Sequence, residues 1–145
     1  MTSEEIISFL PYEYPFLFVD EILSIDENSV SGTYTYSSAL PFYTGHFKDH
    51  PITPGVILTE TMAQIGLVCL GIYLLREAPK LNSNIKIAMT SAAIEYFLPV
   101  LPEEKVWVKS TKEYYRFNKL KCKVEMHNEK KQLVCRGSIS GMLKT

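Results

Sequence analysis

The longest mostly apolar stretch of the chain covers residues 56–75 and contains no proline. Pro51 and Pro54 precede it, and Thr53 is a candidate N-cap with Pro54 at the first helical position. This pattern predicts a helix that begins near residues 53–55 and is roughly 30 Å long at 1.5 Å per residue. Apolar side chains cover nearly its whole circumference, which is typical of a helix surrounded by other structure.

A membrane span is the competing interpretation of this helix, because about 20 predominantly apolar residues suffice to cross a bilayer. Glu60 and Gln64 lie within the stretch, and an acid inside a bilayer is energetically costly. The rest of the chain has strand patterns. We therefore expect a core helix and no membrane span.

Apolar and polar residues alternate on both sides of the helix, with the period of two that β-strands have. Val30, Gly32, Tyr34 and Tyr36 fall on one face of such a strand. The predicted strands are residues 16–25, 30–36, 85–97, 105–116, 119–127 and 132–142.

Short connecting elements complete the pattern. A helix that starts near Ser3 ends before Pro11, and residues 76–79 close the long helix. Turns are predicted at residues 26–28 and 128–131. A hairpin, a long helix and then a run of strands is an α+β order of elements, with one long helix against a mostly antiparallel sheet.

Composition and charge narrow the class of protein. The 145 residues include 15 basic and 16 acidic ones, and this balance argues against a nucleic-acid binder that relies on overall basicity. No repeat or linker interrupts the chain, so residues 1–145 are expected to form one domain. Acids stand near the N-terminus where a secretory signal has basic residues, and Cys69, Cys122 and Cys135 lack C-x-x-C spacing. We expect a cytoplasmic protein with reduced cysteines.

Candidate chemistry is concentrated around the start of the long helix. His46 lies in the preceding loop, and Glu60 is the only acid inside the apolar stretch. Gln64 shares the helix face of Glu60 and can orient its carboxyl group, while burial favours the protonated acid. Gly55 stands where the N–H groups of a helix start stabilise a developing oxyanion. These residues supply a base, an acid and an oxyanion donor. By residue type alone, a satisfied loop histidine and a buried, paired glutamate explain them equally well.

A resemblance to a known family favours the catalytic interpretation. The segment GHFKDHPITPGVILTETMAQ (residues 45–64) resembles the GHFPGxPxMPGVLxxEAMAQ signature of the hot-dog fold 3-hydroxyacyl-ACP dehydratases of the FabZ type. The upstream segment LPYEYPFLFVD (residues 10–20) resembles that family's LPHRYPFLLVDRV opening. The two motifs occur in order, and the resemblance covers roughly residues 8–102.

The resemblance implies a hydro-lyase that needs no cofactor. His46 matches the catalytic histidine of the family, and Glu60 matches its catalytic acid. Gln64 matches the glutamine one turn later, and Gly55 matches the glycine whose N–H holds the thioester carbonyl. Glutamate rather than aspartate at position 60 favours the FabZ type over the related FabA type.

The same resemblance implies a fold, an assembly and a partner. In the hot-dog fold the sheet wraps the helix, two subunits join their sheets edge to edge, and His46 acts with Glu60 of the partner subunit. A homodimer is expected, a trimer of dimers remains open, and an acyl carrier protein delivers the substrate. Phe47, with Phe42 and Tyr43, is a candidate for lining the substrate entrance and equally for the core.

Three departures from the family pattern affect the choice of substrate. Residues 12–13 are Tyr-Glu where the family has His-Arg, and residues 48–50 are Lys-Asp-His where it has Pro-Gly-x. Residues 94–104, IEYFLPVLPEE, replace a VRFRRPVVPGD-like stretch whose arginines help to recognise the carrier protein. A specialised acyl chain, such as a polyene or aryl-polyene precursor, is therefore plausible beside primary fatty-acid synthesis.

Other charged residues have weaker interpretations. Lys119, Lys121 and Lys123 alternate with apolar residues, so one face of their strand is basic. They either dock an acidic carrier protein or form a plain solvated face. His50 and Asp49 beside the loop histidine suggest metal ligands, but no further ligand cluster accompanies them and no metal is expected.

Two other classes of function stay open. A hot-dog thioesterase hydrolyses the same kind of thioester and releases a free thiol instead of an enoyl product. A non-catalytic acyl-binding or assembly subunit keeps the fold without turnover, and the presence of both His46 and Glu60 counts against it. The sequence therefore predicts a 3-hydroxyacyl-ACP dehydratase.

Overall fold

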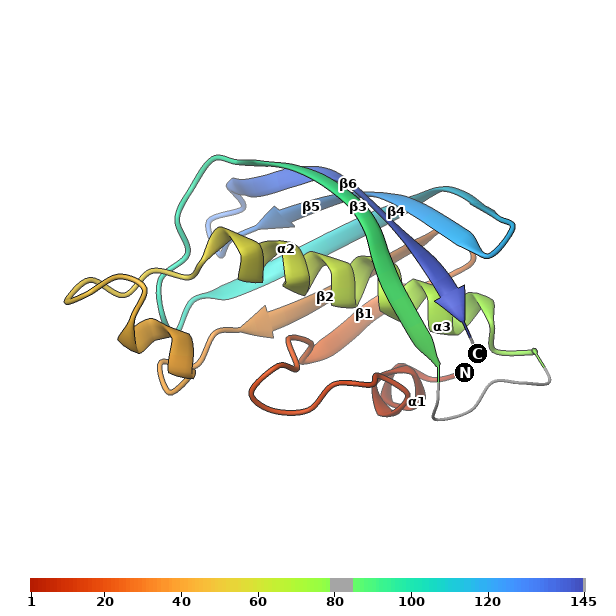
Figure 1. Ribbon diagram of the computed structural model, residues 1–145, viewed down its shortest axis with the longest axis horizontal. Helices are drawn as coiled ribbons and strands as arrows, with labels where there is room; N and C mark the ends of the chain where they lie inside the picture. Colours follow the sequence, from red (N-terminus) through yellow and green to blue (C-terminus); the bar gives the residue numbers. More distant parts are fainter. Residues whose placement is uncertain (79–84, 145) are drawn as a thin grey trace.

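The computed structural model describes residues 1–78 and 85–144, and one continuous helical run lies at its centre (Figure 1). The run consists of α2 (Gly55–Ala63), the π-helical segment η2 (Gln64–Cys69) and α3 (Leu70–Leu74). The long helix predicted over residues 56–75 is confirmed to within one residue at each end.

The N-cap prediction is wrong by one residue. Pro54 is the N-cap and Gly55 the first helical residue, whereas the sequence pattern assigned these positions to Thr53 and Pro54. The Thr53 hydroxyl is instead hydrogen-bonded to the hydroxyl of Tyr43 at 2.5 Å, and its N–H donates to the carbonyl of Val100 at 2.8 Å. The Thr53 side chain is thus bonded to the preceding turn rather than to the first turn of the helix.

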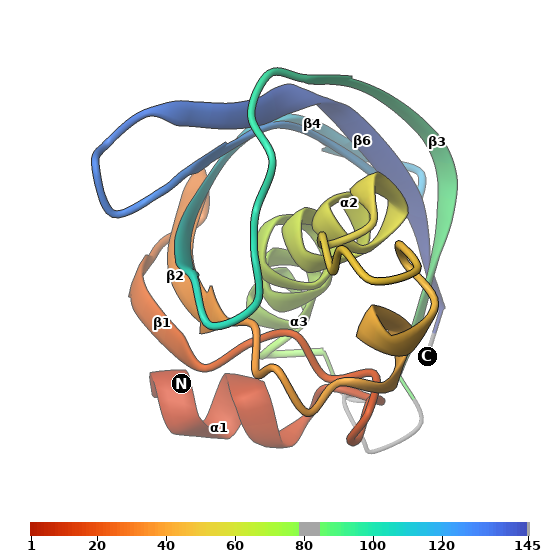
Figure 2. The same cartoon turned by 90° about the vertical axis from the view of Figure 1, so that its left-hand side faces the viewer.

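Six antiparallel strands form one sheet in the order β1-β2-β4-β5-β6-β3. Their bounds are β1 (Glu21–Ile25), β2 (Ser29–Thr35), β3 (Lys86–Tyr96), β4 (Lys105–Arg116), β5 (Lys119–His127) and β6 (Leu133–Lys144). Figure 2 shows the sheet curving around the central helix, with α1 (Ser3–Ser8) outside the open side. This arrangement is the hot-dog fold and confirms the α+β class.

The inner face of the sheet supplies most of the core. Val30, Gly32, Tyr34 and Tyr36 are all buried, as the alternation in the sequence predicts. The same alternation holds in β5, where the apolar residues between the lysines face inward and are fully or almost fully buried.

The helix approaches the sheet closely at Gly66. A Cβ atom at this position would lie 2.9 Å from Cβ of Ser110 and 3.0 Å from a methyl carbon of Val124. The Ser110 hydroxyl donates a hydrogen bond to the Gly66 carbonyl at 2.9 Å. A glycine is therefore needed for this contact between helix and sheet.

Two strands have a boundary that differs by two or more residues from the predicted one, while β2 and β3 differ by one residue at each end. The first begins at Glu21 rather than residue 16, because Phe16 and Phe18 direct backbone groups to the side chain of Gln64 instead of a neighbouring strand. The last strand continues past residue 142 to Lys144, where it still pairs with β3.

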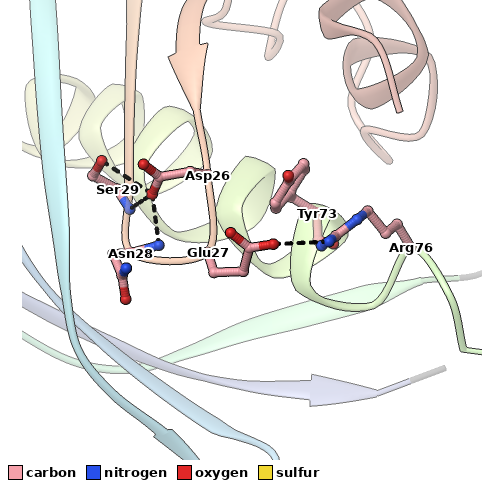
Figure 3. Close-up of polar contacts among 6 residues, drawn as sticks. All are labelled: Asp26, Glu27, Asn28, Ser29, Tyr73 and Arg76. Carbon is pink, nitrogen blue, oxygen red and sulfur yellow. Dashed lines mark hydrogen bonds and ion pairs between the residues drawn. The ribbon is translucent and has the colours of Figure 1, made fainter.

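The predicted turn at residues 26–28 joins β1 to β2 and contacts the far end of the helix (Figure 3). Asp26 accepts hydrogen bonds from two N–H groups of the turn at 2.7 and 2.9 Å, and these bonds lower the pKa of its carboxyl group. Arg76 donates to the Glu27 carboxylate at 2.9 Å and to the Tyr73 carbonyl at 2.8 Å. The hairpin is thereby linked to the C-terminal end of α3.

Burial accounts for the apolar character of the helix. Residues 55–74 form a helix long and apolar enough to cross a membrane, but 78% of its apolar window is buried inside the protein. The three cysteines are free and buried, as expected of packing residues. Pro79, predicted to help close the helix, lies outside the described residues.

Candidate active site

The loop that carries His46 extends away from the rest of the chain at the start of α2 (Figure 1). It follows the 3₁₀ turn η1 (Pro41–Thr44), and backbone hydrogen bonds close it on both sides. The His46 N–H donates to the Phe42 carbonyl at 3.0 Å, and the Ile52 N–H donates to the His46 carbonyl at 2.9 Å. These bonds fix the backbone of a loop whose tip is solvated.

The ring of His46 is held by a backbone carbonyl. Its Nδ1 lies 2.8 Å from the Ile52 oxygen, and its ring stacks on Phe47 with centroids 3.9 Å apart. A carbonyl oxygen only accepts hydrogen bonds, so Nδ1 carries the proton in the neutral ring. Nε2 then keeps its lone pair and is available as a base.

Gln64 positions Glu60 through a side-chain amide whose nitrogen and oxygen are both hydrogen-bonded. Its Nε2 donates to the Glu60 carboxyl group and to the Phe16 carbonyl, both at 3.0 Å. Its Oε1 accepts from the Phe18 N–H at 2.8 Å, and the side chain is completely buried. This orientation of the amide satisfies all three bonds, so the predicted support of Glu60 by Gln64 is present.

Burial keeps the carboxyl group of Glu60 protonated to a higher pH than that of an exposed glutamate. Removal from water raises the pKa of Glu60, and the hydrogen bond from Gln64 opposes this effect. Burial, followed by the negative charge of Glu60, raises the pKa of Tyr12 to about 12. Tyr12 therefore lies close to Glu60, at the position where the FabZ-type motif has histidine.

Gly55 begins the helix beneath an aromatic ring. Its N–H has no acceptor within the helix, as at every helix start. The Tyr96 ring packs against the Cα atom of Gly55, because a Cβ atom added there would lie 3.2 Å from the ring. The hydroxyl of Tyr96 is hydrogen-bonded to that of Thr59. A cavity of about 330 Å³ next to these groups is lined by Val56, Thr59, Met89, Ala92, Ile94 and Tyr96.

The side chains around Glu60 and those of the histidine loop form two separate groups within one chain. Among the described residues, no hydrogen bond links His46 to Glu60: the His46 ring bonds Ile52, and the Glu60 carboxyl bonds Gln64. Phe47 is 54% exposed beside His46, whereas the hydroxyl of Tyr43 is bonded in the core. Tyr43 is therefore a core residue rather than part of an entrance.

Two further features do not add to this site. A larger hollow of about 590 Å³ lies on the outer face of the sheet and is lined mainly by charged residues. None of His46, Gly55 and Glu60 lines it, so we locate the candidate site at the helix start. Within residues 1–78 and 85–144, no group of three or more His, Cys, Asp or Glu side chains is placed to hold a metal ion.

Sequence reasoning missed Tyr12, Thr59 and Tyr96 as neighbours of the site. Tyr12 and Tyr96 both lie in segments that depart from the FabZ-type motifs, and this departure was the available signal. Thr59 gave no signal, because a threonine beside Glu60 is an ordinary helix residue until the ring of Tyr96 is seen to meet it.

Comparison with known proteins identifies one family over most of the chain. The model of the FabA-like domain family matches residues 10–139. A 3-hydroxyacyl-[acyl-carrier-protein] dehydratase FabZ from Sinorhizobium fredii is 36% identical over 144 residues, which cover 97% of this chain and 88% of the relative. FabZ from Acinetobacter baylyi is 41% identical over 83 residues, which cover 57% of this chain and 55% of the relative.

Solved structures with the same fold include more than one kind of enzyme. The dehydratase heterocomplex ApeI:P from Xenorhabdus doucetiae matches 100% of this chain and 93% of its own at a TM-score of 0.80 and 13% identity. A hypothetical thioesterase with coenzyme A from Streptococcus pneumoniae matches 86% of this chain and 84% of its own at a TM-score of 0.62 and 13% identity. At such identities these likenesses show the hot-dog fold alone.

Proposed function

Because this chain belongs to the FabA-like family, we infer that it is a 3-hydroxyacyl-[acyl-carrier-protein] dehydratase, a hydro-lyase. The enzyme converts a 3-hydroxyacyl thioester into a trans-2-enoyl thioester and water. The observation that carries this chemistry is the hydrogen bond from His46 Nδ1 to the Ile52 carbonyl, which leaves Nε2 as a base on the loop next to Gly55.

The proposed reaction uses one base, one acid and one oxyanion donor. His46 Nε2 takes a proton from C2 of the substrate, and the Gly55 N–H stabilises the enolate-like thioester oxygen. The C2–C3 double bond forms as the C3–O bond breaks, and Glu60 gives its proton to the departing hydroxyl group, which leaves as water. The imidazolium returns its proton through solvent to the Glu60 carboxylate, so no cofactor is consumed.

We propose that the working site lies between two copies of the chain. One edge of β3 pairs with β6, and within the described residues no strand lies along its other edge. Every side chain of β3 is exposed or half-buried. Val56 is 74% exposed nearby, and Met89 on β3 is 45% exposed. Pairing of two β3 edges covers these groups, because an open edge is a template for another strand. His46 then acts with Glu60 of the partner subunit.

Product analysis tests this function. Purified protein incubated with a 3-hydroxyacyl-ACP is expected to form the trans-2-enoyl-ACP, seen by mass spectrometry as the loss of one water from an intact thioester. Release of free ACP thiol instead would assign a thioesterase. Unchanged substrate that binds the protein would assign a non-catalytic acyl-binding subunit.

The carrier-docking hypothesis for the β5 lysines needs revision. Figure 1 places the turn between β4 and β5, next to Lys119, at the end of the molecule opposite the His46 loop. Lys121 and Lys123 lie 3.6 and 4.0 Å from the carboxylate of Glu113, which partly neutralises them. Lys119 and Lys121 therefore fit a solvated face better than a docking site, whereas Lys123 lines the same outer hollow as Arg136.

Arg136 is a better candidate for recognising the acyl carrier protein. Its guanidinium carbon lies 5.6 Å from the ring centroid of Phe97, which stands where the FabZ-type motif has an arginine. Glu95 and Glu125 are its neighbours across the sheet, but within the described residues neither carboxylate forms an ion pair with it. We propose that the positive charge which the motif has at position 97 comes here from the exposed Arg136 on β6.

Neutralising this charge is expected to weaken association with the carrier. Arg136→Gln should lower kcat/KM for an acyl-ACP substrate by roughly 3–10-fold and reduce its salt dependence, because a charge at the rim of an interface acts mainly on association. Lys119→Gln removes the same charge at the opposite end and serves as the matched control. Equal losses in both variants, or an equal loss on an acyl-pantetheine substrate, would refute the assignment.

The cytoplasm is the compartment that we propose for this reaction. Cys69, Cys122 and Cys135 are free thiols inside the core, which suits a reducing environment.

A further inference from the structure

Tyr96, the last residue of β3, covers one side of the helix start. Three atoms of its ring lie 3.2, 3.3 and 3.6 Å from where a Cβ atom of Gly55 would be. A side chain at position 55 would therefore push against the ring, and glycine allows the closest approach. The ring and the backbone of Gly55 form one continuous surface beside the proposed oxyanion donor.

A polar contact holds this ring in place. The Tyr96 hydroxyl is hydrogen-bonded to the hydroxyl of Thr59, the residue immediately before Glu60. The FabZ-type motif has phenylalanine at the position of Tyr96, so the motif lacks this hydroxyl group. The hydrogen bond is thus a property of this chain, and it connects the end of β3 to the first turns of α2.

Packing alone does not fix the ring, because Tyr96 is 47% exposed. Its hydroxyl meets a partner that is almost fully buried, since Thr59 is 9% exposed. The ring also borders the apolar cavity of about 330 Å³ that includes Met89 and Ile94. It therefore borders both the Gly55 backbone and an open, mainly apolar hollow.

We propose that Tyr96 is the substrate-positioning residue of this site. Its hydrogen bond to Thr59, here called the latch, holds the ring in place. The acyl thioester packs against this ring when its carbonyl accepts a hydrogen bond from the Gly55 N–H. This inference rests on the proposed function for the identity of the ligand. The thioester carbonyl lies at the helix start, and the acyl carbons continue past the ring into the apolar space between the two paired copies. Reaction requires this alignment, because a displaced thioester loses its hydrogen bond to the oxyanion donor.

The test measures binding of an unreactive thioester, butyryl-pantetheine, to the full-length protein by titration calorimetry. Tyr96→Phe keeps the ring and removes the latch, while Thr59→Val removes the partner hydroxyl at nearly constant volume. Each variant is expected to weaken binding by about 2–12-fold, the range for losing one neutral hydrogen bond. The double variant should bind as weakly as either single one, because all three lack the same bond.

Tyr14→Phe is the matched control, because Tyr14 is 67% exposed and its hydroxyl makes only a 3.5 Å contact with the Ala39 carbonyl. It should bind like the wild type, and all variants should unfold cooperatively within a few degrees of the wild-type temperature. Affinities of Tyr96→Phe and Thr59→Val equal to that of the wild type would overturn the proposal. Additive losses in the double variant would overturn it as well.

Turnover in the same samples separates this inference from the proposed function. If the wild type forms enoyl product, kcat/KM of the two latch variants should fall by the factor seen in binding. If the wild type forms none while the latch variants still bind the thioester more weakly, Tyr96 stands as a thioester-binding residue and the dehydratase assignment fails.

Discussion

Glu60→Gln and His46→Ala should each lower kcat by about 10²–10⁴-fold, the range for losing a general acid or a general base. Glutamine keeps the shape of the glutamate and can still accept the hydrogen bond from Gln64. Its amide group has no acidic proton to give to the departing hydroxyl group. Alanine at position 46 removes the only ring nitrogen that is left free to take the C2 proton. Steady-state rates on a 3-hydroxyacyl-ACP measure both effects.

Two controls test whether a variant loses activity because its fold is damaged. His50→Ala removes an exposed histidine from the same loop and should leave kcat unchanged. Thermal unfolding should also be similar in all variants, since neither His46 nor Glu60 belongs to the fully buried core. Near-normal turnover by either active-site variant would remove that residue from the mechanism.

The wild-type rate should also depend on pH through Glu60. The acid must be protonated to act, so kcat falls as pH rises through the pKa of Glu60 in the enzyme. Because burial raises this pKa, the fall should begin at a higher pH than for an exposed glutamate. The residual activity of Glu60→Gln should lack this limb of the profile.

The long helix and the contact between Glu60 and Gln64 were predictable because each depends on local sequence. The proline-marked start, the apolar stretch and the spacing of Glu60 and Gln64 all act within a few turns of one helix. Periodicity likewise predicted the buried face of β2 and the bounds of β4 and β5. Such features need no knowledge of what lies across the core.

Features that depend on distant segments were not predictable in the same way. Thr53 has every local property of an N-cap, yet its hydroxyl bonds Tyr43 instead. Residues 16–20 were predicted as part of a strand, but the Gln64 amide, 46 positions after Phe18, bonds the Phe18 N–H and the Phe16 carbonyl. The latch between Tyr96 and Thr59 joins residues 37 positions apart. In each case the hydrogen-bond partner belongs to another element of the fold, which the local sequence does not reveal.

Mixing the two inactive variants should restore activity. If two copies join at β3, a heterodimer of His46→Ala with Glu60→Gln has one site without either group and one site with both. Random exchange makes half of the dimers heterodimers, so an equal mixture should recover about one quarter of the wild-type rate. Each variant alone stays inactive at the same total concentration.

This recovered rate is the most direct test that the chain is a dehydratase whose site takes its base from one copy and its acid from the other. Enoyl-ACP formation is followed in the mixture, and native mass spectrometry of distinctly tagged variants counts the heterodimers. We predict that the rate rises in proportion to the heterodimer fraction. Abundant heterodimers without any enoyl product would contradict the account.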